Sequence, residues 1–372
     1  MRETYIDYGK AIFIIMVISV HAGLSSIDSW SYVRMIFFFF VTGYTYTIGK
    51  RSLADGIKRR FTGIMPSFWK LILFNVVLDI IRAEYLGYDD YNIAKADVMF
   101  ALYGANLVPK AVPFSDFFMN EAISPKNLPF AYSVITPLNC HLWFLAAMFS
   151  GCVLFFIYVE KIRRNKFYDI PVILLMLYIA SLESLNTFQL PFSIGRGCFA
   201  CACMIAAVNI KELRLISHTT MKRKIICGLI ALCVFVFAHL NGSYKCSFII
   251  SFYGDGTVFS VLMTYLGGVS AAVLFLYLMQ ILEHYYKSPT LEFIGRNTMT
   301  LYLWNMIFNT IFSILLLKIT GNEVVLDEFN MALLPGNSYL FIFITVLLTV
   351  ITGTLLARYK KSHDGSMLAK II

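Results

Sequence analysis

The sequence predicts an all-α integral membrane protein with about ten transmembrane helices and both termini in the cytoplasm. Of its 372 residues, 59% are hydrophobic and only 14% are charged, whereas soluble domains are usually about 25% charged. Apolar runs of about 20 residues, the length that crosses a bilayer as a helix, follow one another along the chain. Lysine and arginine gather in every second gap between these runs.

The apolar runs divide into ten expected helices. In chain order they cover about 10–27, 32–49, 64–82, 141–159, 168–186, 192–210, 225–240, 257–282, 291–317 and 338–357. The first run lacks a small-residue cleavage site and is followed at once by a second span, so we expect a retained helix rather than a signal peptide. The stretch 240–257 is the least defined and has room for a short re-entrant segment.

The distribution of charge supports this topology. With the N-terminus in the cytosol, the cytosolic gaps and the two tails hold 21 of the 31 lysines and arginines, and the long outer loop at about 83–138 is net acidic. The formal net charge of +9 does not indicate a nucleic-acid partner, because the cations lie between membrane-spanning runs. No soluble domain or internal repeat is visible, which predicts a single polytopic domain over residues 1–372.

The cysteines indicate packing rather than chemistry. Most of the eight lie in apolar runs, where thiols act as small hydrophobes. Cys198, Cys201 and Cys203 are close together without a histidine or carboxylate, so no metal site is expected there. Cys140 and Cys246 both fall on the expected outer side, and a disulfide between them is left open. The sequence has no phosphate-binding glycine loop, zinc-ligand spacing or nucleophile elbow.

The first helix carries the leading candidate for chemistry, His21. An ionisable group inside a span is costly and usually functional, and an imidazole can act as a general base near neutral pH. Lys10 lies eleven residues earlier, which turns about 20° beyond three full helical turns, so both residues share one stripe roughly 16 Å apart. Asp7 lies one turn before Lys10 on much the same face. The alternative for His21 is a hydrogen bond that only packs two helices.

Other candidates lie near the expected ends of the helices. His141 and Trp143 stand at the outer start of the fourth helix, as interface anchors or as part of a substrate site. Lys58, Arg59 and Arg60 precede Pro66 on the cytosolic side, where they either set the topology or bind the phosphates of an anionic cofactor. Arg34 opens the second helix on the outer side, against the local charge rule, and Arg296 stands near the cytosolic start of the ninth.

In these residues the chain resembles the acyltransferase-3 family of integral membrane acyltransferases. Members open with Asp, then Arg or Lys, and a histidine after ten intervening residues, matched here by Asp7, Lys10 and His21. A segment of the type His-Met-Pro-Leu-Phe-Phe-Phe-Leu-Ser-Gly-Tyr is matched by 34–44, a basic segment leading to proline by 58–66, and His-Leu-Trp-Phe-Leu by 141–145. The late Gly-x-x-Ser-Leu-x-x-Tyr-Leu-x-His pattern is matched by 295–305. The resemblance covers nearly the whole chain, in order.

Some positions depart from the family pattern. Lys10 stands where arginine is commoner, which keeps the charge but loses the fork geometry. Arg34 and Ile36 replace His and Pro, and Asn305 replaces the late histidine, which puts any role of that histidine in doubt here. We expect no counterpart of the additional extracytoplasmic esterase-like domain of some members in these 372 residues.

The resemblance implies transfer of an acyl group, most often acetyl, from cytosolic acetyl-CoA to a hydroxyl of a surface polysaccharide or lipid-linked glycan. It implies His21 as the base, Lys10 with Arg60 and Lys58 on the donor, and His141, Trp143, Tyr44, Arg34 and Asp7 in support. Acetyl-CoA would be a donor substrate, with no permanently bound cofactor. Family habit favours a bacterial cell membrane, an inner membrane where there are two.

Two other functions remain open from the residues. A transporter or flippase of a lipid-linked sugar would use the same embedded polar groups without chemistry, and a membrane sensor or scaffold would not need His21. Dependence on acetyl-CoA separates them, since only the enzyme consumes it and releases free thiol. The acceptor sugar, the acylated position, the acyl chain and the oligomeric state are not encoded in any pattern we find.

Overall fold

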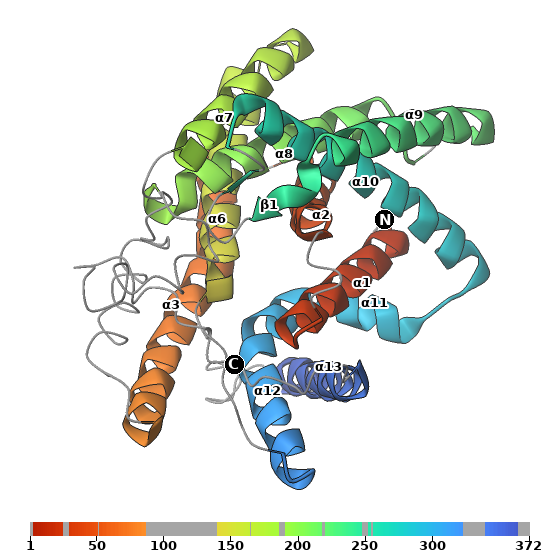
Figure 1. Ribbon diagram of the computed structural model, residues 1–372. Coiled ribbons are helices and arrows are strands. Elements are labelled where there is room, and N and C mark those ends of the chain that lie inside the picture. The colour runs from red at the N-terminus through yellow and green to blue at the C-terminus, as the bar shows by residue number, and fades with distance from the viewer. Residues whose placement is uncertain are drawn as a thin grey trace. The chain divides into compact units, whose positions relative to one another are not determined.

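The computed structural model describes residues 3–24, 30–50, 52–86, 140–163, 165–185, 190–217, 220–247, 252–253, 256–322 and 339–363. These residues are largely helical (Figure 1). They belong to two compact units, the first made of Met1–Trp30 and Phe275–Ile372 and the second of Ser31–Leu274, and each is described by itself. The expected outer loop at about 83–138 lies outside the described residues from 87 onward.

The first unit joins the two ends of the chain. Its elements are α1 (Thr4–His21), the end of α10 (Val258–Tyr285) from Phe275 onward, α11 (Pro289–Arg296), α12 (Thr298–Ile319) and α13 (Tyr339–Ser362). Helix α1 packs against α11, α12 and α13, and α12 packs against α13. The first helix of the sequence is therefore surrounded by the last three.

The second unit is organised around one buried helix. Its elements are α2 (Ser31–Tyr44), α3 (Leu53–Leu86), α6 (Trp143–Ile157), α7 (Asp169–Leu185), α8 (Ile194–Glu212), α9 (Met221–Leu240), the short strands β1 (Cys246–Ser247) and β2 (Phe252–Tyr253), and α10 up to Leu274. Helix α8 packs against α2, α6 and α7, and α3 packs against α6. Every residue of α8 from Gly195 to Val208 is buried.

Small residues allow this dense packing around α8. A Cβ added to Gly43 of α2 would lie 2.3 Å from the carbonyl oxygen of Met204, and one added to Gly151 of α6 would lie 2.8 Å from the Cβ of Ala200. Cys198, Cys201 and Cys203 are buried free thiols on the same helix. Close backbone approach at small residues is a principal means by which helices associate in lipid, where no hydrophobic force drives them together.

The boundaries of the first helix differ from those expected. Helix α1 spans Thr4–His21 rather than about 10–27, so His21 is its last residue and not one deep within it. The cause is Gly23, which has a φ of 100°. The Gly23 amide donates to the Val20 carbonyl at 2.9 Å and the Leu24 amide to the Ser19 carbonyl at 3.0 Å. This pair of bonds is a Schellman ending, for which glycine is the favoured residue.

Two further predicted spans have different limits. Helix α3 begins at Leu53, not near 64, because the Ser52 hydroxyl accepts from the Asp55 amide at 3.2 Å and caps its first turn. The expected basic turn at Lys58–Arg60 is therefore helical. The prediction of one continuous ninth helix at about 291–317 is wrong, because the segment divides at Asn297 into α11 and α12. The side-chain amide nitrogen of Asn297 donates to the Phe293 carbonyl at 2.7 Å.

The poorly defined stretch after α9 contains a short hairpin rather than a re-entrant helix, as far as its described residues go. Strands β1 and β2 pair antiparallel, with Cys246 opposite Tyr253. Cys246 is buried and its thiol is free, so the disulfide left open with Cys140 is not formed. Burial raises the pKa of the Cys246 thiol well above its ordinary value, which keeps it neutral.

Seven of the described helical segments are long and apolar enough to cross a membrane. They are Thr4–His21, Trp143–Ile162, Pro191–Glu212, Met221–Leu240, Val258–Tyr285, Thr298–Ile319 and Tyr339–Ser362. Helix α2 is apolar but shorter, at 14 residues. The helical membrane architecture is thus confirmed, whereas the count of ten spans and the side on which the termini lie stay predictions.

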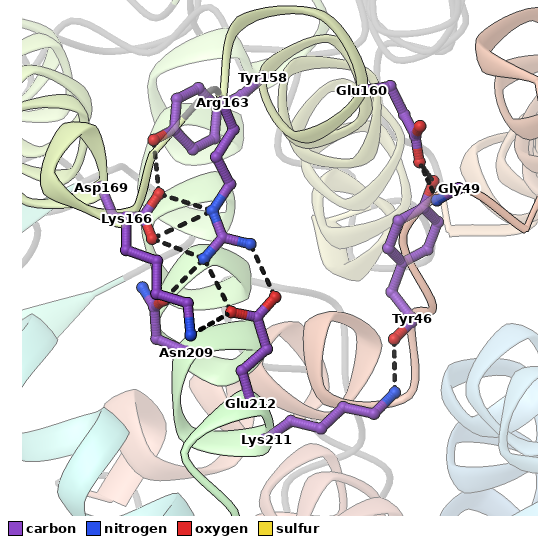
Figure 2. A network of polar contacts seen from close by, with 10 residues as sticks. All are labelled: Tyr46, Gly49, Tyr158, Glu160, Arg163, Lys166, Asp169, Asn209, Lys211 and Glu212. Atoms are coloured by element: carbon purple, nitrogen blue, oxygen red, sulfur yellow. Dashed lines mark hydrogen bonds and ion pairs between the residues drawn. The ribbon is translucent and has the colours of Figure 1, made fainter.

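Three loops expected on the cytosolic side of the second unit meet in one polar network (Figure 2). Arg163, which follows a π-helical turn at Tyr158–Ile162, donates to Asp169 at 2.9 Å and to Glu212 at 2.9 Å. Glu160 accepts from the Tyr46 hydroxyl at 2.7 Å, and the Lys211 ammonium donates to the Tyr46 carbonyl at 2.6 Å. The loops after α2, α6 and α8 therefore lie on one side of this unit, as the predicted alternation requires.

In the first unit, backbone contact holds α11 against α1. A Cβ added to Gly295 would lie 1.8 Å from the carbonyl oxygen of Asp7. On α12, the side-chain amide nitrogen of Asn309 donates to the Ile18 carbonyl of α1 at 3.0 Å. The Thr349 hydroxyl of α13 donates to the side-chain oxygen of Asn309 at 2.7 Å. The side chain of Asn309 therefore ties α1, α12 and α13 together.

Replacing Arg163 should destabilise the second unit. Arg163→Gln removes the guanidinium from Asp169, whose side chain is 2% exposed, and we expect a loss of about 3 kcal/mol in the free energy of unfolding. Thermal unfolding in detergent measures this. The exposed neighbour Lys161→Gln is the control and should leave the melting temperature unchanged. Equal melting temperatures for both variants would contradict the structural role of the network.

Adding a methyl group at Gly295 should separate α11 from α1. Since the new Cβ overlaps the backbone of Asp7, Gly295→Ala should cost about 1–3 kcal/mol of stability. At Gly63 on α3 an added Cβ meets nothing within 4 Å, so Gly63→Ala should be neutral or stabilising by up to about 1 kcal/mol. Thermal unfolding of both variants checks this: the melting temperature should fall in Gly295→Ala and stay the same or rise in Gly63→Ala. A Gly295→Ala protein as stable as Gly63→Ala would show that the two helices are not in contact.

Candidate functional site

The end of α1 places the imidazole of His21 against α12. Because the helix stops at Gly23, His21 occupies the final turn, where its side chain is half-buried. The Nδ1 atom of His21 lies 2.5 Å from the Oδ1 atom of Asn305 on α12. The residue that replaces the family's late histidine is thus the hydrogen-bond partner of the expected base.

Asn305 is itself held in a single orientation. Its side chain is completely buried, and its amide nitrogen donates to the carbonyl of Tyr302, one turn earlier on α12. The amide oxygen therefore faces His21. A buried amide that satisfies both of its ends in this way is a rigid partner for the imidazole.

A charged cluster surrounds Asp7 at the other end of α1. The Asp7 carboxylate is 1% exposed, and it lies 3.4 Å from the Lys10 ammonium and 3.4 Å from the Arg296 guanidinium. Arg296 also pairs with Glu292 on its own helix. The side chains of Lys10 and Arg296 are 23% and 48% exposed. Asp7 therefore orients two cationic side chains that are partly exposed.

The first unit thus brings together residues from both ends of the chain. Asp7, Lys10 and His21 lie on α1, as the sequence suggested, and Arg296 and Asn305 reach them from α11 and α12. Asn305 was visible in the sequence only as a departure from a pattern, and its contact with His21 could not be inferred from spacing. The other candidates belong to the second unit.

In the second unit, His141 and Trp143 are buried rather than set at the surface. His141 lies in a 3₁₀ turn (Cys140–Leu142) and Trp143 begins α6. The guanidinium of Arg196 lies 5.0 Å from the centre of the Trp143 ring, a cation–π contact. Anchors in a lipid interface would expose their rings, so the burial argues against that alternative.

Arg196 and Glu183 are buried charges that no sequence pattern singled out as site residues. Arg196 is completely buried at the start of α8, and Glu183 near the end of α7 accepts from the Gly195 amide at 2.7 Å. Phe192 and Ser193, just before α8, have φ values of 50° and 53°, which is unusual for residues with a side chain. The available signal was an arginine between two glycines in an apolar run.

Arg34 and Tyr44 lie on α2, which packs against α8 and contacts β1. Arg34 is buried near the start of the helix. Tyr44, its last residue, has its hydroxyl 3.0 Å from the Ser217 hydroxyl in the loop after α8. This contact gives Tyr44 a role in fixing that loop to α2.

Lys58 and Arg60 lie in the first turns of α3. Lys58 is exposed and Arg60 is half-buried. Their helical setting, which the sequence did not suggest, spaces them two residues apart and so directs them to different sides of the helix. Among the described residues, no group of three or more histidine, cysteine and carboxylate side chains is arranged to hold a metal ion.

The arrangement can perform proton transfer at one end of α1 and bind an anion near the other. A hydrogen-bonded imidazole can accept a proton at neutral pH. Lysine and arginine at the edge of the unit are suited to phosphate groups.

Comparison with known proteins identifies the family. The acyltransferase-3 model, described as an acyltransferase domain, matches residues 3–362, nearly the whole chain. No curated protein and no solved structure matches. The matched range includes both helical units and every candidate residue named above. The chain therefore belongs to the acyltransferase-3 family and is a membrane acyltransferase.

Proposed function

We propose that the protein transfers an acetyl group from cytosolic acetyl-CoA to a hydroxyl of a surface polysaccharide or lipid-linked glycan, with His21 as general base. The observation that carries the proposal is the position of the His21 imidazole, which is hydrogen-bonded to Asn305 of α12. His21 lies on α1, the helix that also carries the Lys10 cation. Membership of the acyltransferase-3 family supports the reaction class. Family habit favours a bacterial cell (inner) membrane as its location.

The chemical step needs one residue that can both take and return a proton. The imidazole accepts the proton of the acceptor hydroxyl while the hydroxyl oxygen attacks the thioester carbonyl carbon. As the tetrahedral intermediate collapses, the carbon–sulfur bond breaks and the imidazolium returns the proton to the sulfur. The products are an O-acetyl ester and free CoA thiol, so acetyl-CoA is a substrate and no bound cofactor is required.

The donor is expected to bind through its phosphates, which lie far from its thioester. Lys10 and His21 are separated by roughly 16 Å along α1, so one extended molecule can have its phosphates near Lys10 and its thioester near the imidazole. Asp7 orients the Lys10 ammonium. Lys58 and Arg60 of the second unit, an exposed and a half-buried cation of the predicted cytosolic side, stay donor-binding predictions that rest on the family resemblance.

For the acceptor, the family resemblance implies His141, Trp143, Arg34 and Tyr44 of the second unit, whose side chains are buried. Hydroxyl-rich ligands are commonly bound by aromatic and polar side chains. No observation favours a transporter or a scaffold over the enzyme, and release of CoA thiol from acetyl-CoA separates the three.

Removing the imidazole should abolish acetylation. In cells whose surface glycan carries gene-dependent O-acetyl groups, His21→Ala should lower their content by about 100-fold or more, because the general base is lost. Glycan NMR measures the acetyl content, and immunoblotting of membranes verifies insertion. The exposed His363→Ala is the matched control and should behave as wild type. Full acetylation by a normally inserted His21→Ala protein would disprove the mechanism.

Removing the Lys10 charge should weaken donor binding more than the chemical step. We expect Lys10→Met to raise the KM for acetyl-CoA about tenfold and Lys10→Arg to retain most affinity, since arginine keeps the charge toward phosphate. Release of CoA thiol by membrane vesicles at varied acetyl-CoA concentrations gives both constants. Lys318→Met, an exposed position at the end of α12, is the control. An unchanged KM in Lys10→Met would remove Lys10 from the donor site.

A further inference from the structure

The hydrogen bond between His21 and Asn305 determines which imidazole nitrogen can act as a base. A neutral imidazole carries its proton on either Nδ1 or Nε2, and only the other nitrogen has a lone pair available to accept one. The nitrogen that faces Asn305 is Nδ1, at 2.5 Å from the amide oxygen.

The direction of that bond follows from the other end of the asparagine. The Tyr302 carbonyl is an acceptor without a proton, so the group of Asn305 that contacts it must be the NH₂. The group that faces His21 is then the amide oxygen, which also has no proton to give. The hydrogen of the short contact therefore belongs to Nδ1, and the lone pair of the neutral ring lies on Nε2.

We infer that Asn305 is a positioning residue, which holds His21 as the Nδ1-protonated tautomer and so makes Nε2 the nitrogen that accepts the substrate proton. This inference rests on the proposed role of His21 as the base. Asn305 does not touch the reacting atoms itself, and its contribution comes through the orientation and protonation of the ring.

The framework around Asn305 supports a fixed geometry rather than a chance contact. One turn further along α12, Asn309 bonds to the Ile18 carbonyl on α1 and accepts from Thr349 on α13. These bonds fix α12 against the last turns of α1, the part of the helix that carries His21. The packing of α12 on α1 therefore does not depend on Asn305 alone.

The neutrality of the amide also has a chemical consequence. A carboxylate in the same place would accept the same hydrogen bond but would favour the imidazolium, since an opposite charge within about 4–6 Å stabilises the charged form. An amide orients the ring without adding charge.

Asn309 provides a matched control, because it is also a buried asparagine on α12 that bonds to α1. Its side chain bonds to Ile18 and Thr349, whereas that of Asn305 bonds to the imidazole. If Asn305 served only to join the helices, the two positions should respond alike to replacement by leucine.

The direct test is the ¹⁵N spectrum of histidine-labelled protein in lipid bilayers, in which the two neutral tautomers have distinct chemical shifts. The chain has six histidines, and the His21 signals are those missing from His21→Gln. Wild type should show the Nδ1-protonated form at neutral pH. Asn305→Leu should shift His21 toward the other tautomer or a mixture, and Asn309→Leu should not. A wild-type ring protonated on Nε2 would overturn the inference without reference to any activity.

The kinetic test separates positioning from packing. Asn305→Leu should lower kcat about tenfold or more with KM changed less than twofold, because donor and acceptor contacts remain while the lone pair is misplaced. Asn305→Asp retains an acceptor oxygen and should recover part of kcat relative to Asn305→Leu. Equal losses in Asn305→Leu and Asn309→Leu would assign Asn305 to packing alone.

The two proposals fail in different ways. An active His21→Ala protein would overturn the proposed role of His21 as the base. The contribution of Asn305 to catalysis would then be overturned too, whichever tautomer the spectrum shows. An inactive His21→Ala protein together with an Asn305→Leu protein of wild-type kcat would overturn only the positioning role.

Discussion

A polar side chain inside a membrane helix must find its partner on a neighbouring helix, and this requirement organises both units. In the hydrocarbon region water is not there to satisfy a buried donor or acceptor. His21 meets Asn305, the Ile18 carbonyl meets Asn309, and Glu183 accepts from the start of α8. Each such bond fixes the rotation of one helix against another. Buried polar residues therefore specify how the helices pack.

Small residues complement these polar bonds. At Gly295 the backbones of α11 and α1 touch, and at Gly43 and Gly151 the neighbours of α8 also approach it closely. In the first unit this approach brings Arg296, next to Gly295, within 3.4 Å of Asp7. Had Gly295 a side chain, the charged cluster would be displaced along with the helix. Glycine at this position thus allows both the close packing of the two helices and the ion pair between Arg296 and Asp7.

The sequence was sufficient for those features that depend on local patterns, and insufficient for those that depend on pairing. Apolar runs located the helices, and the eleven-residue spacing correctly placed Lys10 and His21 together on α1. The start of α3 was missed although Ser52 and Asp55 are an ordinary capping pattern. The break at Asn297 was missed although the polar stretch 295–298 interrupts the apolar run there. The partners Asn305 and Arg296 lie nearly 300 positions away from α1, and Arg196 meets Trp143 across two helices. No periodicity carries such long-range information.

The composition of the first unit has a consequence for the order in which the protein matures. Helix α1 leaves the ribosome first, and its neighbours α11, α12 and α13 leave it last. Chains are synthesised from the N-terminus over many seconds, so α1 waits in the bilayer until nearly all of the sequence has been inserted. During that interval its histidine and buried carboxylate have none of the partners that α11 and α12 supply. Assembly of this unit thus requires synthesis beyond α12: a chain terminated after α10 would contain His21 and Asp7 but lack Asn305 and Arg296, which contact them.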